Sequence, residues 1–582
     1  MNLRICVLRS RQGERALRQG RQKLPQGPTA RLFVLAVALG WLVCPSLRVR
    51  AEAAMAPAGT TFDLTLSDLR QRVLQRNESL QSRLLGFEAQ RRRSRGEYGV
   101  FEPDLYGSYG HEVNNRQNTA VQQASLLGAQ TFNETNNNYG FGLESLIPTG
   151  ARVKLGYTLG DLHNNVQPAQ GVTNGEYQTF FGLTVTQPLL KNFGTAATMA
   201  GIRLAAISNR VAFQEYRRDL MAMISAAEAT YWNLYLAQEQ VHFFEESVKT
   251  AASILRDNRA RFQAWKGSEL EVLEAEAGLG LRQAKLAEAQ QKEVEAVNRL
   301  ISLYAQEAPA GGLGVRATDI PQATGEVPEY QTLRQALFDL NPDYLIALEK
   351  VQQNRVRLGF ARNQRLPELN LKGSYGLNGL GNTLGSSWSD VEQSSYPSWF
   401  VGVEFNIPLG GGMKTRNELI AARLEFESSE LALRGLKIEI LNSLNTAWHK
   451  LQSTHGSVAQ YQTAVKYNLS LLGAALARLE AGKIESRKVL EIDVDLLEAR
   501  VSVVESLVRS QIASLELEML LGVFLEKRHL EITMANLQLA TVPFDRSRSL
   551  NDPAYQQGLD EVGRRLGETE VQDSRFLNIP VR

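Results

Sequence analysis

The sequence of 582 residues contains only two cysteines, Cys6 and Cys44. Both lie ahead of the point at which we expect an export signal to be removed. The mature chain would then contain no cysteine, which excludes a disulfide scaffold, thiol catalysis and a cysteine-ligated zinc site. Histidine is also scarce, and no two of the six histidines stand in a His-Glu-x-x-His pattern. We therefore predict no catalytic residue, no metal site and no cofactor.

The sequence also lacks an excess of charge of one sign. Its 64 basic and 62 acidic residues give a formal net charge of +2. Residues 1–54 hold ten of the basic and two of the acidic residues, and without them the charge falls to about −6. Neither balance indicates a nucleic-acid partner, and the composition is that of an ordered protein.

Long apolar runs are absent beyond the N-terminal region. Eight basic residues between Arg4 and Arg31 precede an apolar run over residues 32–44, and small residues follow from Ala51. This order predicts that residues 1–54 form a signal peptide. The alternative is a membrane anchor. The run is shorter than the roughly 20 residues of a membrane-spanning helix, which favours the signal peptide. An exported membrane protein without further runs would have to cross the bilayer with strands.

Proline is missing from two long windows. After Pro188 the next proline is Pro309, and after Pro408 the next is Pro543. Proline interrupts helices because it lacks an amide donor and clashes with the preceding turn. Both windows are rich in Ala, Leu, Glu, Arg and Gln, which favour helix. The windows therefore predict long helices.

Each window contains one break, at residues 265–268 in the first and at residues 481–483 in the second. The breaks predict two helical hairpins, each with an arm of about 67 residues and a return arm of about 37–40 residues. At 1.5 Å per residue the long arms would reach roughly 100 Å. A pair of cytosolic coiled-coil hairpins would show the same pattern, so the strands described below are needed to decide.

The chain also repeats itself at long range. Leu69 and Asn77 match Leu333 and Asn341 at one offset, and Lys266 matches Lys483 at another. An ordered series of such matches indicates duplication. Each copy would run as a helix of about 32 residues, strands, a long helix and a shorter helix, and the two shorter helices could stack end to end beside the long one. We predict the following division: first repeat 64–305, linker 306–330, second repeat 331–525, and a mostly irregular C-terminal periplasmic tail 526–582.

Strands are predicted between the short and long helices, at about 103–188 and 367–408. Large apolar residues such as Tyr139, Phe141 and Leu143 alternate there with glycine, hydroxyl and charged residues. This alternation is typical of strands with one face toward lipid and one toward water, although a soluble sandwich would also produce it. Long polar stretches over 112–138 and 160–177 would be extracellular loops. Aromatic residues near the strand ends could form girdles: Tyr106, Tyr109, Tyr177, Phe180, Tyr375, Tyr396, Trp399 and Phe400.

One chain supplies too few strands to close a barrel, so closure would need several subunits. The first copy holds about 46 more residues than the second in this region, as the offset between the copies shows. The extra residues surround a turn at 147–150. We expect an additional hairpin there, which would give up to six strands per subunit in place of four.

Several duplicated motifs resemble those of the TolC-like outer membrane efflux proteins. They are Leu366-Pro367-Glu368-Leu369 at the start of the strands, Gln187-Pro188-Leu189-Leu190 and Ile407-Pro408-Leu409-Gly410 at strand-to-helix junctions, and Arg478-Leu479-Glu480-Ala481-Gly482 at a hairpin tip. The resemblance covers about residues 64–525. It implies a mixed, mainly α fold, in which long coiled-coil hairpins form a periplasmic tunnel and a trimer shares a transmembrane β-barrel.

The resemblance also implies a function and partners. The chain would be a subunit of a homotrimer in the cell outer membrane, a passive exit duct for a tripartite efflux pump or a type I secretion system. A periplasmic adaptor (membrane fusion protein) would dock on it, an inner-membrane transporter of the RND, ABC or MFS type would supply the energy, and outer-membrane lipid would surround it. The alternative is a periplasmic adaptor-type coiled-coil protein. The exported cargo is not specified by the sequence.

By position, the resemblance assigns two sets of residues. The periplasmic gate would comprise Glu485, Lys488, Glu491 and Asp495, whose spacing allows them to share one helix face. The plain structural alternative is a solvated helix face. The adaptor-docking tips would comprise Lys266, Gly267, Ser268, Ala481, Gly482 and Lys483. In the first tip Trp265 replaces the family glycine, which departs from the expected contact geometry.

Overall fold

A computed structural model describes residues 61–125, 128–172, 175–305, 314–322, 327–530 and 532–534. The chain separates into two units, Met1–Pro57 and Ala58–Arg582. The predicted signal peptide, residues 1–54, lies outside the described residues, as does most of the predicted tail. All that follows concerns the second unit.

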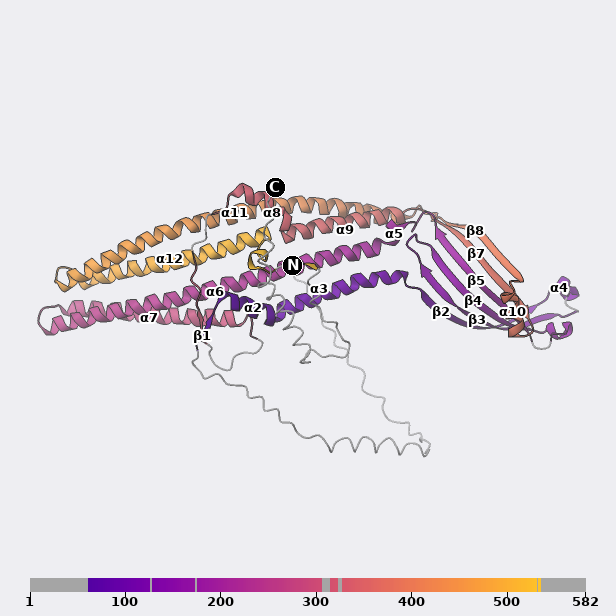
Figure 1. Ribbon diagram of the computed structural model, residues 1–582, viewed down its shortest axis with the longest axis horizontal. Helices are drawn as coiled ribbons and strands as arrows, with labels where there is room; N and C mark the ends of the chain where they lie inside the picture. Colours follow the sequence, from indigo (N-terminus) through magenta and orange to yellow (C-terminus); the bar gives the residue numbers. More distant parts are fainter. Residues whose placement is uncertain are drawn as a thin grey trace, which may run out of the picture. The chain divides into compact units, whose positions relative to one another are not determined.

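Two helical hairpins run along this unit. The first consists of α6, Ala200–Gln263, and α7, Glu269–Ile301, and the second of α11, Met413–Glu480, and α12, Ser486–Leu521 (Figure 1). The long arms have 64 and 68 residues and the return arms 33 and 36. The two hairpins predicted from the proline-free windows are confirmed. No helix in the described ranges is both long and apolar enough to cross a membrane.

The single helix of about 32 residues expected ahead of the strands is wrong in both copies. The structure has two helices each time: α2, Leu66–Arg76, then α3, Glu78–Gly96, and α8, Tyr330–Leu340, then α9, Pro342–Gln364. Asn77 and Asn341 cause the break. Each has an extended backbone, and each side-chain oxygen accepts a hydrogen bond from the amide three residues on, Leu80 or Tyr344, at 2.9 Å. This is helix N-capping, which starts a new helix in a new direction.

The helices form one layer. In the half nearer the sheet α3, α6, α9 and α11 lie side by side, and in the half that ends at the hairpin tips the order is α7, α6, α12 and α11 (Figure 1). The short helices therefore stack end to end beside the long ones, as predicted. The two capping asparagines also hold these joints, because the Asn77 amide donates to the Leu303 carbonyl at 2.8 Å and the Asn341 amide to the Leu520 carbonyl at 2.7 Å.

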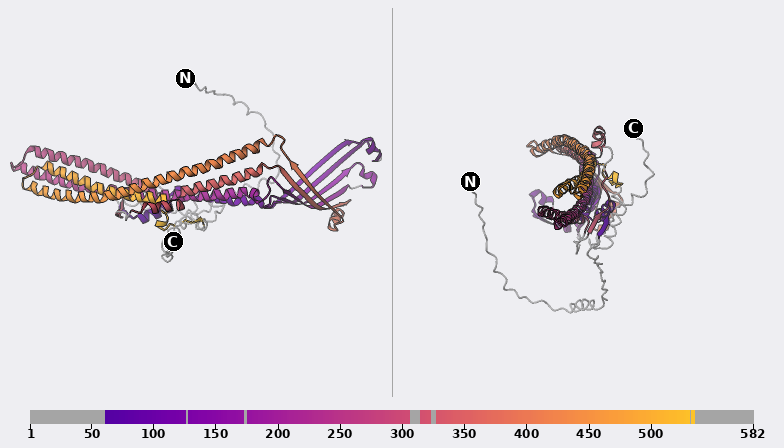
Figure 2. Two further views of the ribbon diagram at one scale, coloured as in Figure 1. Left: turned by 90° about the horizontal axis from the view of Figure 1, so that it is seen from above. Right: turned by 90° about the vertical axis from the view of Figure 1, so that its left-hand side faces the viewer.

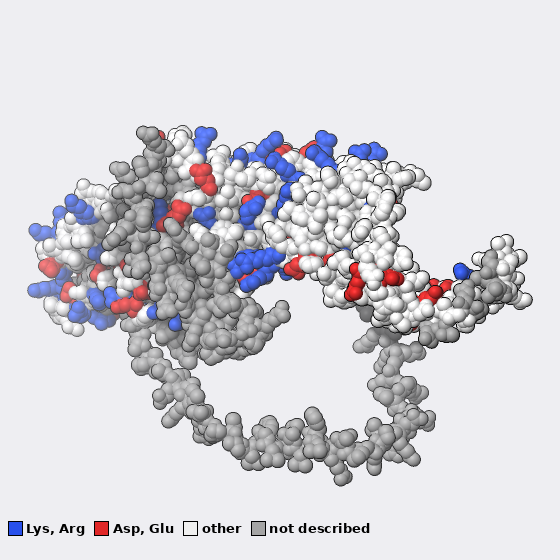
Figure 3. Space-filling view, turned by 45° about the vertical axis from the view of Figure 1, so that its right-hand side comes forward, with Lys and Arg blue, Asp and Glu red and all other residues white. Residues whose placement is uncertain are grey.

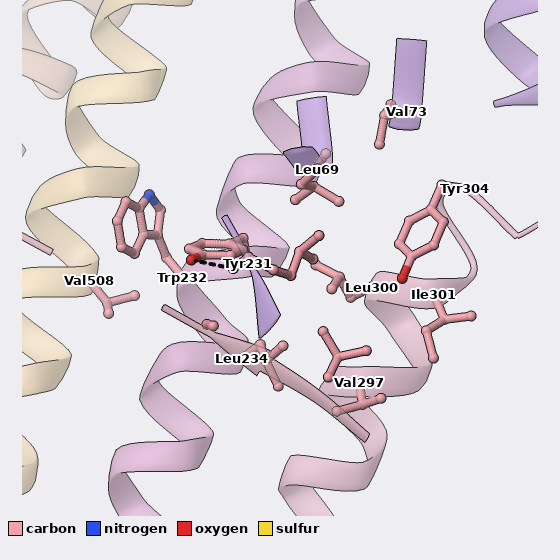
Figure 4. Packing of buried hydrophobic residues seen from close by; sticks show 14 of the residues in the cluster. Leu69, Val73, Tyr231, Trp232, Leu234, Val297, Leu300, Ile301, Tyr304 and Val508 are labelled. Atoms are coloured by element: carbon pink, nitrogen blue, oxygen red, sulfur yellow. Dashed lines mark hydrogen bonds between the residues drawn. The ribbon is translucent and has the colours of Figure 1, made fainter. Parts of the chain in front are cut away.

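The largest buried cluster surrounds Tyr231 on α6 (Figure 4). The Tyr231 hydroxyl lies 3.1 Å from the Leu64 carbonyl oxygen and accepts from the backbone N–H groups of Thr318 and Asp319 at 3.1 and 2.9 Å. These groups belong to or follow two short strands, β1, Thr61–Leu64, and β6, Gly314–Ala317, which pair in parallel. The predicted linker 306–330 is thus wrong for residues 314–317, which form a strand fixed to α6.

The predicted tail also begins too early. A 3-10 turn, η3 at Glu526–Arg528, follows α12, and Phe524, Leu525 and Leu530 are buried in the helical core. Arg528 pairs with Glu228 of α6 through two contacts of 2.6 and 2.8 Å. Residues up to 530 therefore belong to the helical layer, because their charged run supplies partners for buried acids.

Six antiparallel strands form a sheet in the order β2-β3-β4-β5-β7-β8. Their bounds are β2 Asp104–Gln117, β3 Thr131–Leu146, β4 Arg152–Asn164, β5 Glu176–Pro188, β7 Glu368–Gly381 and β8 Tyr396–Asn406. Strands β3 and β4 are the additional hairpin expected around 147–150, so the six-strand prediction is confirmed. The β2–β3, β4–β5 and β7–β8 connections lie at the end away from the long helices (Figure 1).

The predicted loop 112–138 is strand over residues 112–117 and 131–138, and the predicted loop 160–177 is strand over residues 160–164 and 176–177. Residues 112–117 pair with 131–136, and residues 160–164 pair within the sheet as well. Asparagine and other polar residues there hide the alternation, but the backbone ladder still satisfies the amides. The short helix α4, Ala120–Ser125, lies between β2 and β3.

The register aligns residues of one kind into rows across the strands. One face carries an exposed apolar row: Leu105, Leu143, Leu155, Leu183, Tyr375 and Trp399. We call this the apolar face. The opposite face, the glycine face, carries a row of paired glycines: Gly142, Gly156, Gly182 and Gly376. Lys154, Lys372 and Glu404 share the glycine face, with Lys372 paired to Glu404.

The aromatic-girdle prediction is wrong for half of its members. By alternation Tyr106, Phe180, Tyr396 and Phe400 lie on the glycine face. A Cβ added at Gly142 or Gly156 would stand 2.6 or 2.5 Å from the Tyr106 hydroxyl. These glycines therefore make room for aromatic rings that lie across the sheet.

Candidate functional site: the hairpin tips and the exposed face of α12

The two hairpin tips have the same backbone geometry. In the first, the Lys266 N–H donates to the Arg261 carbonyl at 2.8 Å; in the second, the Lys483 N–H donates to the Arg478 carbonyl at 2.9 Å. Gly482 adopts a left-handed φ of 67°, which glycine tolerates. Ser268 caps α7 by accepting from the Leu270 N–H at 3.2 Å. The sequence-predicted tip residues Lys266, Gly267, Ser268, Ala481, Gly482 and Lys483 all lie in these turns.

Trp265 keeps the turn despite replacing the glycine. Its φ is 56°, close to that of Gly482, although a left-handed conformation costs a non-glycine residue about 1–2 kcal/mol. The indole is 96% exposed. A large aromatic side chain held in a strained conformation with almost no contact to its own chain points to a role outside it. The sequence revealed the substitution, but its exposure required the structure.

The tips lie next to each other. Arg261 of α6 donates to the Leu479 carbonyl of α11 at 2.6 Å, and Asn258 donates to the Ser486 hydroxyl at 2.9 Å. A cluster of buried residues that includes Ile254, Leu479 and Val489 packs beneath them. Both tips therefore present one composite end surface.

The four predicted gate residues, Glu485, Lys488, Glu491 and Asp495, are all exposed along α12. The buried residues Val489 and Leu496 alternate with them along the helix. Lys488 donates to Glu491 at 2.9 Å, and Arg487, which sequence reasoning overlooked, donates to it at 3.3 Å. The stripe thus contains an ion-paired acid together with Glu485 and Asp495.

The Lys488 contact predicts a pH response for Glu491. Its hydrogen bond and its charge, and then those of Arg487, hold the pKa of Glu491 below its ordinary value, because they favour the carboxylate. Glu491 should therefore keep its negative charge and its attraction to Lys488 through mildly acidic pH, and lose both as pH falls through the lowered pKa.

A Lys488→Met variant should raise the pKa of Glu491 toward its ordinary value. The measurement is the pH dependence of the δ-carbon shift in glutamate-labelled protein, assigned by difference from a Glu491→Gln variant. An Arg487→Met variant should produce a smaller rise. An unchanged midpoint in Lys488→Met would show that this ion pair does not form in solution.

A buried ion pair between α7 and α12 lies close to these exposed residues in the sequence of α12. Arg282 of α7 and Asp493 of α12 are 5% and 6% exposed, and Arg282 contacts Asp493 Oδ2 through two nitrogens at 3.1 and 3.2 Å. The Ser247 hydroxyl of α6 donates to the same oxygen at 2.6 Å, and Arg282 also donates to the Leu490 carbonyl at 2.9 Å. Three helices from both hairpins meet at this group, which we call the hairpin clasp.

Sequence reasoning missed the clasp, because it considered only the exposed acids of α12 as gate residues and did not single out Asp493. One signal was present: Asp493 falls at helical spacing within the stripe Val489, Leu490 and Leu496. An acid among apolar residues on one helix face requires a buried partner. The clasp has the character of a structural link, since its charges are paired and closed to solvent.

Two stretches of the chain, residues 152–306 and 333–523, match the family described as outer membrane efflux protein. Together they cover more than half of the 582 residues. The chain belongs to the outer membrane efflux protein family. The predicted family and the outer-membrane location are confirmed, and members of this TolC-type family are transport channels and not enzymes.

Individual relatives of this efflux channel support the same family and fold. Outer membrane efflux protein BepC of Brucella suis biovar 1 (strain 1330) is 22% identical over 329 residues, which are 56% of this chain and 68% of that protein. The CmeC outer membrane channel of Campylobacter jejuni has a TM-score of 0.58 at 15% identity, covering 87% of this chain and 89% of that one. VceC of Vibrio cholerae has a TM-score of 0.56 at 15% identity, covering 78% and 96%. These structures show the shared fold and confirm the predicted fold class.

Proposed function

We propose that this efflux channel is a homotrimer whose sheets join into one transmembrane barrel and whose helices join into one tunnel. The observation that carries the proposal is that both layers end in open edges. Strands β2 and β8 each pair on one side only in the described sheet. The apolar face of β8 remains exposed at Trp399, Val401, Val403 and Phe405. Open edges of this kind are normally closed or covered.

The helical layer ends in a similar way. Its edge helix α11 carries exposed apolar residues at Ile420, Leu424, Leu431 and Ile438, with spacing that places them along one side. Such a stripe marks a contact surface. Seen along the helices, the layer is curved and not flat (Figure 2). Copies joined edge to edge would therefore close into a ring, and three copies would supply about 18 strands, enough to enclose an aqueous channel.

The distribution of charge supports an orientation in which the sheet lies in the outer membrane and the helices lie outside it. Lysines and arginines gather over the helical part, whereas a broad surface toward the sheet carries neither sign of charge (Figure 3). The apolar face then contacts outer-membrane lipid and the glycine face lines the water-filled interior. The helices extend into the periplasm.

The ends of the tunnel have separate roles in this proposal. A periplasmic adaptor docks on Lys266, Gly267, Ser268, Ala481, Gly482 and Lys483, with exposed Trp265 as the anchor, since aromatic anchors dominate many interfaces. Glu485, Lys488, Glu491 and Asp495 form charged rings at the periplasmic entrance when tripled. An inner-membrane transporter of the RND, ABC or MFS type supplies the energy for an efflux pump or a type I secretion system.

We further propose that the chain comprises two tandem copies, 64–305 and 331–525. The adaptor alternative is less well supported, because an adaptor would carry one hairpin flanked by soluble β-domains. This chain has two hairpins, each preceded by strands of the same sheet.

The edge contact is tested by Leu431→Arg. An arginine in the apolar stripe should prevent assembly, so the trimeric mass of detergent-solubilised protein should give way to a monomer and channel conductance in planar bilayers should fall more than about tenfold. Leu431→Met conserves the contact and should behave as the native protein. Val121→Arg, on α4 beyond the sheet, is a second control. A monomeric native protein without conductance would refute the proposed trimer.

A further inference from the structure

In the part of the chain that the structure describes, one helix packs on the sheet and not in the helical layer. It is α10, Leu384–Glu392, in the connection between β7 and β8 at the end away from the long helices. Thr383 and Ser386 close a capping box at its start, so this nine-residue helix has a defined N-terminus.

Helix α10 packs on the apolar face of the sheet. The hydroxyls of Ser387 and Thr179 lie 2.6 Å apart, and both residues are fully buried. The Trp388 ring meets those of Tyr157 and Phe181 edge-on, at centroid distances of 5.5 and 6.5 Å. Tyr157, Thr179 and Phe181 all belong to the apolar face by strand alternation and register.

The sheet is shaped to receive the helix. A Cβ added at Gly379 would collide with the Ser387 carbonyl oxygen, and one at Gly381 with the Ser386 hydroxyl. The Asp390 carboxylate accepts from the Leu380 N–H at 3.3 Å. Glycine at these two positions of β7 therefore permits an approach that any other residue would prevent.

One flank of α10 is apolar and exposed, whereas Ser386 and Glu392 are exposed polar residues elsewhere on the helix. Leu384 and Trp388, one turn apart, are 48% and 38% exposed, whereas Ser387 and Val391 are buried against the sheet. The Trp388 indole N–H donates to Glu392 at 3.0 Å, so its polar edge is satisfied within the helix. An apolar surface beside a satisfied indole and a carboxylate is the composition that membrane interfaces favour.

The level of α10 on the sheet coincides with the border of the apolar face. On β2 to β4 the continuous apolar rows end at Tyr109, Tyr139 and Leu159, and beyond them only Val113 of β2 is apolar on this face. The next outward-facing row is polar: His111, Asn137 and Asp161, joined by hydrogen bonds of 2.9 and 3.1 Å. Both rows continue on β5 and β7. The first continues as Thr179 and Gly379 and the second as Tyr177 and Gly381, and α10 lies over these positions.

We propose that α10 is an interfacial helix, with Leu384 and Trp388 in contact with lipid chains at the headgroup boundary of the outer leaflet. The polar row on β2 to β4 and α10 on β5 and β7 together define one border of the lipid-facing surface. The proposal rests on the proposed function, in which the apolar face contacts lipid.

Lipid, and not a second copy of the chain, is the occupant that fits. Helix α10 covers β5 and β7, which lie inside the sheet, whereas copies would join at the edge strands β2 and β8. Trp388 of α10 also contacts Phe181, an exposed residue of the apolar face that lies two positions from Leu183 in the exposed apolar row.

The test uses nitroxide labels on single cysteines, with Cys6 and Cys44 replaced by serine. Leu384→Cys is the probe, Phe141→Cys on the apolar face is the lipid reference, and Lys292→Cys on α7 is the aqueous reference. The protein is reconstituted in phosphatidylethanolamine–phosphatidylglycerol vesicles, and collision with oxygen is compared with collision with a water-soluble nickel chelate. We expect an oxygen-to-nickel ratio at position 384 several-fold above that at 292 and at or below that at 141.

Two outcomes would overturn the assignment: a ratio at 384 equal to that at 292, or low collision with both reagents, which would mean that protein covers the helix. A water-like ratio at 141 would instead overturn the membrane-embedded sheet, and so the proposed function. If Leu384→Cys fails to assemble, quenching by brominated lipid is compared between native protein and Trp388→Phe. The native protein should show the larger lipid-quenched component, and equal quenching would count against the proposal.

Discussion

Replacing Asp493 by alanine should lower the free energy of unfolding of the helical section by about 3–5 kcal/mol. The substitution leaves the Arg282 guanidinium, 5% exposed, without its carboxylate, and it leaves the Ser247 hydroxyl without its acceptor. A buried charge without a partner is far more costly than an exposed one, because neither water nor another group replaces the lost contact. The loss should be detected as faster amide hydrogen exchange in α7 and α12 and as a lower melting temperature.

Two controls separate the burial of charge from the loss of a contact. Glu276→Ala removes an exposed ion pair with Arg259 near the same tip and should cost less than about 1 kcal/mol. An Arg282→Met, Asp493→Leu double variant removes both charges and should recover most of the stability. If Asp493→Ala were as mild as Glu276→Ala, the hairpin clasp would be open to water in solution.

Asn341→Ala should cost about 2–4 kcal/mol, the second largest effect expected. The alanine removes the cap of α9, which is worth about 0.5–2 kcal/mol, and it also removes the donor to the Leu520 carbonyl, whose burial without a partner costs about 1–3 kcal/mol. The free energy of unfolding and the exchange of amides in the first turn of α9 measure the two losses separately.

Asn341→Asp is the matched control. Aspartate still caps α9 but cannot donate to Leu520, so it should retain slow exchange in the first turn of α9 while losing part of the global stability. The equivalent Asn77→Ala should act in the same way at Leu303, with a somewhat smaller effect because Asn77 is less buried. Equal stability of Asn341→Ala and the native protein would contradict the role assigned to both joints.

Some of this architecture was readable from the sequence because it depends on local chemistry. The absence of proline over 189–308 and 409–542 was enough to place both hairpins, and the change of offset between the copies was enough to place the β3–β4 hairpin. Alternation located the strands where their faces differ, but failed where both faces are polar, as in residues 131–138.

Other features depend on contacts that the sequence does not display. The Asn77 amide bonds to a carbonyl 226 residues away, and β1 pairs with β6 across a similar separation. Asp493 is buried and Asp495 is exposed because of the side on which α12 packs against its neighbours, which the sequence alone does not show. The placement of α10 on the apolar face likewise arises only when distant segments meet, whereas the left-handed φ of Trp265 belongs to its own turn.

The additional β3–β4 hairpin changes where a duct of this kind resists flow. Barrel diameter grows roughly in proportion to strand number, so six strands per copy in place of four would widen the bore about 1.5-fold and its cross-section about 2.2-fold. The helical layer gains nothing from the hairpin, because β3 follows β2 and β4 precedes β5 without any added helix in that layer. Hydraulic and electrical resistance would therefore be concentrated at the periplasmic end, where the two tips meet, and the outer mouth would contribute little to either.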